Sequence, residues 1–336
     1  MLSKYPNIKW NMAVILICHI FLWVAGNEAV DIDWYVQLAP LPYLKENPLQ
    51  AIWYLHGCPP GLSIVWYLTH LFGSWQYSVL HLITIGLHLL SYYWLNALIK
   101  KVFQNSIYNW VLFGLMLNPL WFIYFKYPFY STYLFGIVSG WLYVHYCQPD
   151  RNKQLIRIAL LLSLACLFRS SWHLVIVTGL TLWYFPKTNT KAKVIAICFL
   201  LLPFSVYLKN YVVFGTFSGT TWSAMNWANG NHIPCKEGVA GIPAFSPISA
   251  YEGVLPSLKN QSVKYPEIPQ LHEGNVHDIK IIEVNKAYQI KRDSCFSLSH
   301  SLGIWAKEGF WHYLESPAEY TFLYKGNHEG KVTQGI

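Results

Sequence analysis

The stretch VDIDWYVQLA, from Val30 to Ala39, places two carboxylates beside an aromatic pair. It follows the segment from Trp10 to Asn27, which contains no charged residue. A carboxylate near a bilayer is costly unless it faces water, a partner or a cavity. One that is held at the end of a membrane span can accept a proton from a bound substrate. Asp31 and Asp33 are therefore the candidate catalytic residues, and the alternative is that they only solvate a loop.

Composition indicates a membrane protein around these residues. Hydrophobic residues make up 54% of the 336 residues and charged residues only 12%, whereas soluble domains contain about 25% charged residues. Several charge-free runs match the roughly 20 apolar residues that cross a bilayer. The first run lacks a small-residue cleavage site and further runs follow, so we expect a retained span and not a cleaved signal peptide.

Basic residues mark the predicted topology. Cytoplasmic loops carry an excess of Lys and Arg, so the net charge of +8 is interpreted as a topology signal and no nucleic-acid partner is expected. Of the 14 Lys and Arg up to Lys209, ten fall in four clusters: Lys4 and Lys9; Lys100 and Lys101; Arg151, Lys153 and Arg157; and Lys187, Lys191 and Lys193. We place these clusters inside and the segments between them outside.

The predicted fold class is a polytopic α-helical membrane protein with about seven transmembrane helices. The spans are expected at residues 11–26, 78–99, 107–123, 130–147, 155–168, 171–185 and 193–208. One long helix with Arg169 inside it is the alternative to the two short segments, and it would invert everything downstream. The run from Asn47 to Ile99 is long enough for two spans. We expect Gly61–Gly73 to be a helix at the outer interface, because an extra span would place Lys100 and Lys101 on the outer side of the membrane.

The chain is thereby divided into a transmembrane region, 1–209, whose first outer loop is 27–77, and a soluble outer region, 210–336. The outer region contains 10 Lys and Arg, 11 Asp and Glu, and no apolar run of span length. Cys235 and Cys295 lie in it, where a disulfide between them is permitted. No CxxC pair or HExxH motif indicates a metal site. Within the spans, hydrogen-bonded packing residues are expected at His19, His81 and His88.

The chain resembles the GT-C glycosyltransferases at its acidic stretch and at HGCPPG, from His56 to Gly61. This superfamily contains the protein O-mannosyltransferases and the bacterial lipid A aminoarabinose transferases. Its members carry an Asp-Glu pair and a Tyr in the first outer loop, followed by a Lys-Pro-Pro or His-Pro-Pro turn. Asp31 matches the Asp, Tyr35 matches the Tyr, and Pro59-Pro60 matches the turn.

Two positions depart from that pattern. Ile32 stands where the family has Glu, and Cys58 stands where it has the basic residue before Pro-Pro. Asp33 and His56 are the candidates to substitute for them. The chain also ends at GKVTQGI, before the further spans that the family usually has, which suggests a truncated, divergent or inactive member.

The resemblance implies an inverting transfer of a sugar from a polyprenyl-phosphate donor to an unknown acceptor at the outer or lumenal face, with no metal or other cofactor. Asp31 would be the general base, and Tyr35 and His56 would bind substrate. A cation would stabilise the phosphate leaving group. Arg169 and Lys126 are the candidates, although each could instead snorkel to the interface. The surrounding lipid would be that of a bacterial inner membrane or the ER membrane.

Two alternative functions are kept. A transporter would be expected to have polar or broken helices near the bilayer midplane and repeat symmetry, and neither is evident in the sequence. A non-catalytic relative with the GT-C fold, which binds lipid or a partner, is favoured by Ile32 and Cys58.

Overall fold

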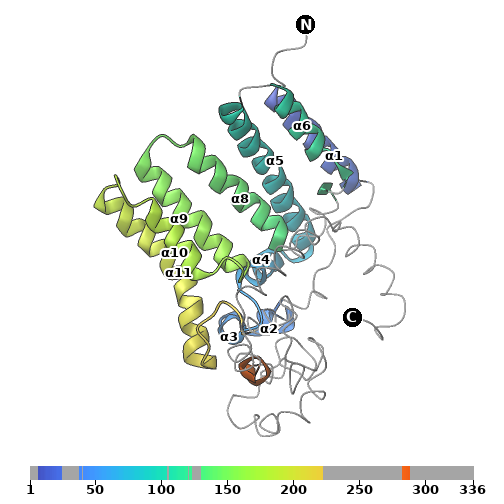
Figure 1. Cartoon of the computed structure of the whole chain (residues 1–336). Coiled ribbons are helices and arrows are strands. Elements are labelled where there is room, and N and C mark those ends of the chain that lie inside the picture. Colours follow the sequence, from blue (N-terminus) through green and yellow to red (C-terminus); the bar gives the residue numbers. More distant parts are fainter. Residues whose placement is uncertain are drawn as a thin grey trace, which may run out of the picture.

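The computed structural model describes residues 7–24, 38–39, 41–103, 106–119, 121–122, 130–221 and 282–287. In these ranges the chain is mostly helical and contains no strand. The helices of the main row are α1 (Ile8–Val24), α5 (Gln76–Val102), α6 (Ser106–Met116), α8 (Tyr130–Cys147), α9 (Arg151–Phe168), α10 (Leu174–Trp183) and α11 (Thr190–Phe214). They form a row in which α5, α8, α9 and α11 follow one another (Figure 1). α1 and α6 pack on α5, and α10 packs on α9 and α11.

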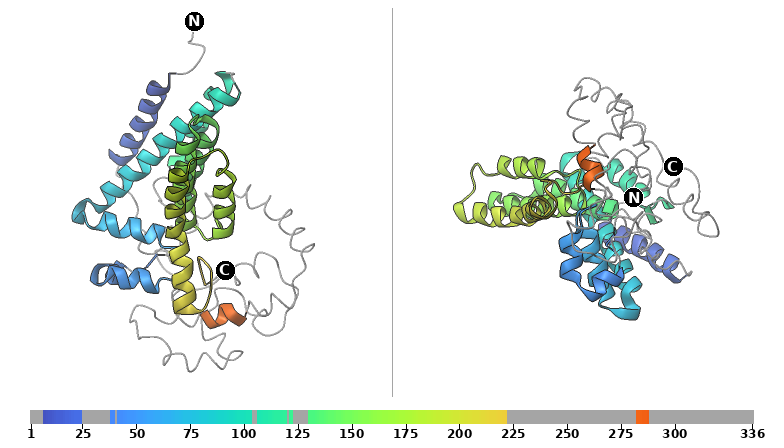
Figure 2. Two further views of the ribbon diagram at one scale, coloured as in Figure 1. Left: turned by 90° about the vertical axis from the view of Figure 1, so that its left-hand side faces the viewer. Right: turned by 90° about the horizontal axis from the view of Figure 1, so that it is seen from below.

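Three short helices lie across one end of the row. They are α2 (Leu41–Glu46), α3 (Pro48–Tyr54) and α4 (Gly61–His70), and the 3-10 turn η1 (Gly73–Trp75) leads into α5. Figure 2 shows the short helices, in blue, roughly perpendicular to α11, in yellow. The separate helix that was expected within Gly61–Gly73 is therefore present as α4, and it is distinct from the long helix α5.

Each predicted span coincides with one long helix, and the break at Arg169 is confirmed. α9 ends at Phe168, Arg169 has an extended backbone (φ −148°, ψ 131°), and α10 begins at Leu174. The alternative of one long helix through Arg169 is wrong. The segment expected over 107–123 is too long, because α6 ends at Met116. The sequence Asn118-Pro119 follows, and a residue before proline is disfavoured in the α conformation.

Among the described residues, two helices are by length and composition long and apolar enough to cross a membrane. They are Gly73–Val102, which includes η1, and Thr190–Phe214. Three further helices are apolar but shorter, namely Ile8–Val24, Ser106–Met116 and Leu174–Trp183. α8 and α9 are 18 residues long, but polar residues in α8 and basic residues in the first half of α9 lower their hydropathy. The sequence prediction of about seven crossings therefore goes further than these two helices establish.

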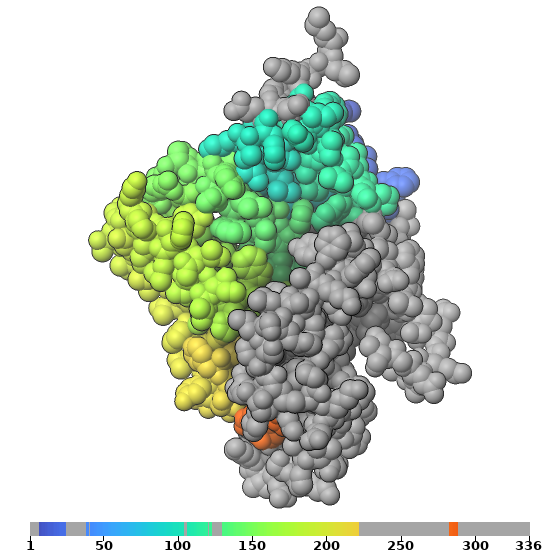
Figure 3. Space-filling view, viewed as in Figure 1, coloured from blue at the N-terminus to red at the C-terminus, as the bar shows by residue number. Residues whose placement is uncertain are grey.

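Polar side chains line the inside of the row, and apolar ones cover much of its outside. On α1 the buried residues are Asn11, Ile15 and His19, whereas Phe21 is 72% and Val24 82% exposed. The flank formed by α10 and α11, at the edge of the molecule in Figure 3, likewise exposes Val175, Trp183, Val194, Leu201 and Val212. Soluble monomers rarely expose apolar surface on this scale.

α1 packs on α5 through two polar contacts. Asn11 Nδ2 donates a hydrogen bond to the Tyr92 hydroxyl (2.7 Å). Two turns further along α1, His19 Nε2 lies 2.9 Å from His88 Nδ1, and the His81 ring centroid is 5.9 Å from that of His19. All three histidines are buried. His19 and His88 are thus hydrogen-bonded packing residues, as the sequence predicted.

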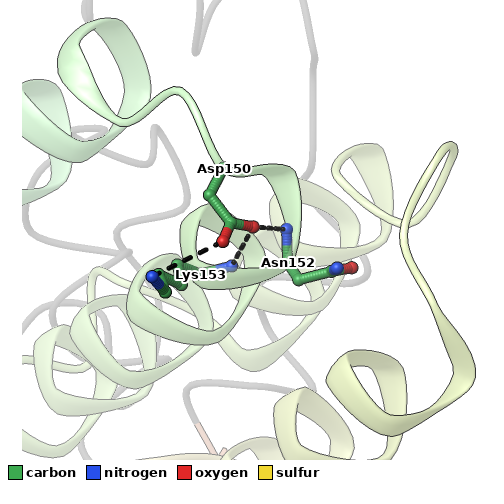
Figure 4. Close-up of polar contacts among 3 residues, drawn as sticks. All are labelled: Asp150, Asn152 and Lys153. Carbon is green, nitrogen blue, oxygen red and sulfur yellow. Dashed lines mark hydrogen bonds and ion pairs between the residues drawn. The ribbon is translucent and has the colours of Figure 1, made fainter.

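Two of the basic clusters meet at the end of the row opposite the short helices. Asp150 caps α9 by accepting hydrogen bonds from the backbone N–H groups of Asn152 (2.9 Å) and Lys153 (3.2 Å), as Figure 4 shows. The Lys153 N–H lowers the pKa of the Asp150 carboxyl below its ordinary value. Asn152 Oδ1 also accepts from the backbone N–H of Asn189 (2.9 Å). The start of α11 therefore lies beside the start of α9. Basic residues are unfavourable near the positive N-terminal end of a helix dipole, and the carboxylate of Asp150 offsets this effect at the start of α9.

Candidate functional site

The described residues on either side of the acidic stretch lie toward the end of the row where the short helices lie. The residues Asp31, Asp33, Tyr35 and Lys126 lie outside the described residues. α1 runs toward this end and stops at Val24 (Figure 1). The described chain resumes at Leu38 and Ala39, which are buried against α4. The Ala39 backbone N–H donates to Ser63 Oγ at 3.1 Å.

The HGCPPG loop is bound to the chain that follows α11. His56 is buried, and its Nδ1 lies 2.8 Å from Thr221 Oγ1. The Thr221 backbone N–H donates to the His56 carbonyl at 2.9 Å, and Thr220 Oγ1 donates to the Gly57 carbonyl at 2.7 Å. The His56 ring centroid is 5.0 Å from that of Phe214. These contacts fix the loop against the end of α11.

Lys209 of α11 contacts the same loop. Its Nζ donates to the Leu55 carbonyl and lies 5.6 Å from the Phe214 ring centroid. Among the described residues, no carboxylate forms an ion pair with Lys209. Burial raises the pKa of the neighbouring Cys58 thiol to about 12, although the Lys209 ammonium acts in the opposite direction. Cys58 is therefore a neutral thiol at pH 7 and a poor nucleophile.

Arg169 lies at the end of α9 on the same side of the molecule. Its guanidinium carbon is 4.4 Å from the centroid of the Tyr130 ring, at the start of α8. The Phe168 ring before it stacks on Tyr133 with centroids 4.8 Å apart. Arg169 is exposed and has no ion pair with any described carboxylate. A guanidinium that stacks on an aromatic ring still presents its N–H groups for bidentate binding of an anion.

Gly61 brings the HGCPPG loop against the end of α9. A Cβ atom on Gly61 would lie 2.6 Å from the Leu167 carbonyl oxygen, closer than two such atoms can pack. The loop therefore contacts α11 through the Leu55 carbonyl and α9 through Gly61. It connects the two helix ends that carry Lys209 and Arg169.

This contact predicts a specific sensitivity at Gly61. Gly61→Ala is expected to destabilise the protein by about 1–3 kcal/mol, because overpacking against backbone forces the loop or α9 to move. Gly86→Ala is the matched control, since a Cβ there meets nothing within 4 Å. Thermal unfolding of both variants in one detergent checks the prediction. Equal melting temperatures for the two variants would show that the contact between residue 61 and the Leu167 carbonyl does not require a glycine.

The arrangement is suited to binding an anion. Lys209 and Arg169 are two basic side chains at one end of the row, and in their charged forms ammonium and guanidinium groups form strong charge-assisted hydrogen bonds with phosphate. Within the described ranges, no three His, Cys, Asp or Glu side chains are grouped so that they could hold a metal ion. The chemistry of the described residues is therefore that of an anion site beside a Pro-Pro turn.

Lys209 is the residue of this site that the sequence interpretation missed, because it was used only as a topology mark. A signal was present: the apolar run continues after Lys209 as far as Phe214, and α11 includes both. An ionisable residue within an apolar helix is a functional candidate by default. The contact with Leu55 carried no signal, because the two residues are 154 positions apart.

The described residues form a helical bundle with two basic side chains, Lys209 and Arg169, at one end. Comparison of the chain with protein-family models, curated proteins and solved structures gives no match. The residues and their geometry, together with the GT-C resemblance at the acidic stretch and the Pro-Pro turn, are therefore what indicate a function.

Proposed function

We propose that the chain is a polytopic membrane glycosyltransferase that moves a sugar from a polyprenyl-phosphate donor to an acceptor at the outer or lumenal membrane face. One observation carries the proposal. The flanks of the acidic loop, the HGCPPG loop and two cations without a described carboxylate partner occur at one end of the bundle. The membrane would be a bacterial inner membrane or the ER membrane, as the resemblance implies.

The exposed apolar surface supports a membrane location for the whole row. Phe21 and Val24 on α1, and Trp183 and Val212 on the opposite flank, are mostly exposed, and contact with lipid would remove this surface from water. The start of α9 and the start of α11, which carry basic clusters, lie together at the other end. That end would be cytoplasmic by the positive-inside rule. The chain would then make about seven crossings, in which the helices α6 and α10, at 11 and 10 residues, cover only part of the roughly 30 Å hydrocarbon core.

The proposed reaction uses both sets of groups. Asp31 accepts the proton of an acceptor hydroxyl while that oxygen forms a bond to the anomeric carbon of the donor sugar. The bond between the anomeric carbon and the phosphate oxygen breaks, and the electron pair leaves with polyprenyl phosphate. Lys209 and Arg169 stabilise the phosphate as its charge develops. Asp33 orients the base, Tyr35 and His56 position the substrates, and Lys126 is a further cation for the phosphate.

The test is release of polyprenyl phosphate by the purified full chain in lipid vesicles. A panel of polyprenyl-phosphate sugars is offered with crude membrane extract as the source of acceptor. Release with one donor, dependent on acceptor, is expected. Passage of a donor or sugar across the vesicle membrane without release would instead support the transporter, and binding without release would support a non-catalytic relative.

The topology gives a prediction of its own. In intact cells, an impermeant maleimide is expected to label Lys45→Cys, in the last turn of α2, but to label Lys191→Cys, in the first turn of α11, only after the membrane is permeabilised. Both native side chains are exposed, so access to reagent depends on the side of the membrane. Labelled peptides are mapped by mass spectrometry, which leaves the native cysteines in place. The reverse pattern would refute the proposed orientation.

A further inference from the structure

A separate hollow lies on α3, close to the proposed site. It has a volume of about 380 Å³ and is lined by Asn47, Leu49, Gln50, Trp53 and Tyr54. None of these five residues is charged, and they include two carboxamides and two aromatic rings. Trp53 is 50% exposed. We call this feature the α3 hollow.

The two carboxamides hold each other in a defined orientation. Asn47 Oδ1 accepts from the Gln50 backbone N–H (3.3 Å) and caps α3. Asn47 Nδ2 donates to Gln50 Oε1 (2.8 Å). Gln50 Oε1 therefore accepts a hydrogen bond within the protein, and the two N–H donors of the Gln50 side chain can bind a ligand. The half-exposed indole of Trp53 lies one helical turn further along.

This combination favours one kind of ligand. A sugar ring has an apolar C–H face that can pack on an indole, whose negative face attracts weakly positive C–H groups. Its hydroxyl groups can accept and donate hydrogen bonds to carboxamides. A phosphate would require a cation, and none lines the hollow. A purely apolar ligand would leave the NH₂ group of Gln50 without a partner, which carries a free-energy penalty. The hollow is wide open on one side, so a ligand there would be only partly enclosed.

We infer that the α3 hollow binds a neutral sugar residue, and that this residue belongs to the acceptor. The acceptor is then a glycan or glycolipid. The identification as acceptor rests on the proposed transfer activity, whereas sugar binding does not. Tyr54, at the end of α3, is followed directly by Leu55, whose carbonyl accepts from Lys209. The hollow therefore adjoins the loop on which the donor phosphate would lie.

Sugar binding is tested first, without any need for transfer. Methyl hexopyranosides and neutral disaccharides are added to the purified full chain in detergent micelles, and saturation-transfer NMR measures their binding. Trp53→Ala is expected to weaken binding at least about tenfold, because the stacking face is lost. Gln50→Ala should weaken sugar binding several-fold, which is about half of the loss in binding free energy expected for Trp53→Ala. Trp53→Phe should retain most of it.

Trp75→Ala is the matched control, because Trp75 is 68% exposed on the same side but does not line the hollow. It should bind as the unmodified chain does. No binding by the unmodified chain, or equal binding by Trp53→Ala, would overturn the inference. Trp53-dependent binding without transfer to any acceptor would uphold the sugar site and refute the glycosyltransferase. Transfer in which Trp53→Ala leaves the acceptor KM unchanged would exclude the α3 hollow as the acceptor site.

Discussion

Asp31→Asn is expected to reduce sugar transfer by at least about a hundredfold. General base catalysis commonly contributes two to four orders of magnitude, and an amide cannot accept the proton of the attacking hydroxyl. The change preserves the shape of the side chain, so protein yield and donor affinity should remain as they are. The initial rate of polyprenyl phosphate release, at saturating donor, is the quantity to measure.

Asp33→Asn is the comparison for Asp31, because it removes a charge two residues away. A milder loss is expected if Asp33 only orients the base. Equal rates for Asp31→Asn and the unmodified chain would remove Asp31 as the base. A complete loss in Asp33→Asn, with activity kept in Asp31→Asn, would exchange the two roles.

Arg169→Ala is expected to raise the donor KM about tenfold to a hundredfold. Hydrogen bonds to charged groups contribute about 1.5–3 kcal/mol, and each 1.4 kcal/mol is a tenfold change in affinity. Arg169→Lys should keep part of the affinity, since an ammonium is a point charge and lacks the bidentate geometry. Acceptor KM should change little. The measurement is the donor concentration dependence of the initial rate.

Lys209→Met is expected to raise the donor KM, as Arg169→Ala does. It also removes the hydrogen bond to the Leu55 carbonyl, so Lys209→Arg, which keeps both the charge and a donor, is its control. A donor KM that is unchanged in both Arg169→Ala and Lys209→Met would show that the phosphate binds elsewhere. The GT-C mechanism could then no longer be assigned to this end of the bundle.

The positions of the long helices were predictable from sequence because the information is local. Charge-free runs bounded by basic clusters gave one helix for each expected span, and the charged Arg169 together with the cluster at Lys187–Lys193 indicated the break between α9 and α10. The early end of α6 was also local, since Asn118 precedes a proline and is disfavoured in the α conformation. Hydropathy alone did not establish that every helix crosses a membrane, because α8 and α9 are less apolar than α5 and α11.

The candidate site was only partly predictable. The Pro-Pro turn and Arg169 could be selected from their residue types, but their arrangement depends on packing between distant segments. His56 contacts Thr221 across 165 positions, and Lys209 contacts Leu55 across 154.

Sequence by itself determined where the helices of the row lie and the break at Arg169, because apolar runs, prolines and charges act on the chain within a few residues. Only the tertiary structure decided that α1 turns Asn11 and His19 toward α5, and that Gly61 meets Leu167. It alone brought Lys209 to the loop before Pro59. Such contacts arise from shape complementarity between helices, and a linear pattern carries no record of which surfaces will meet.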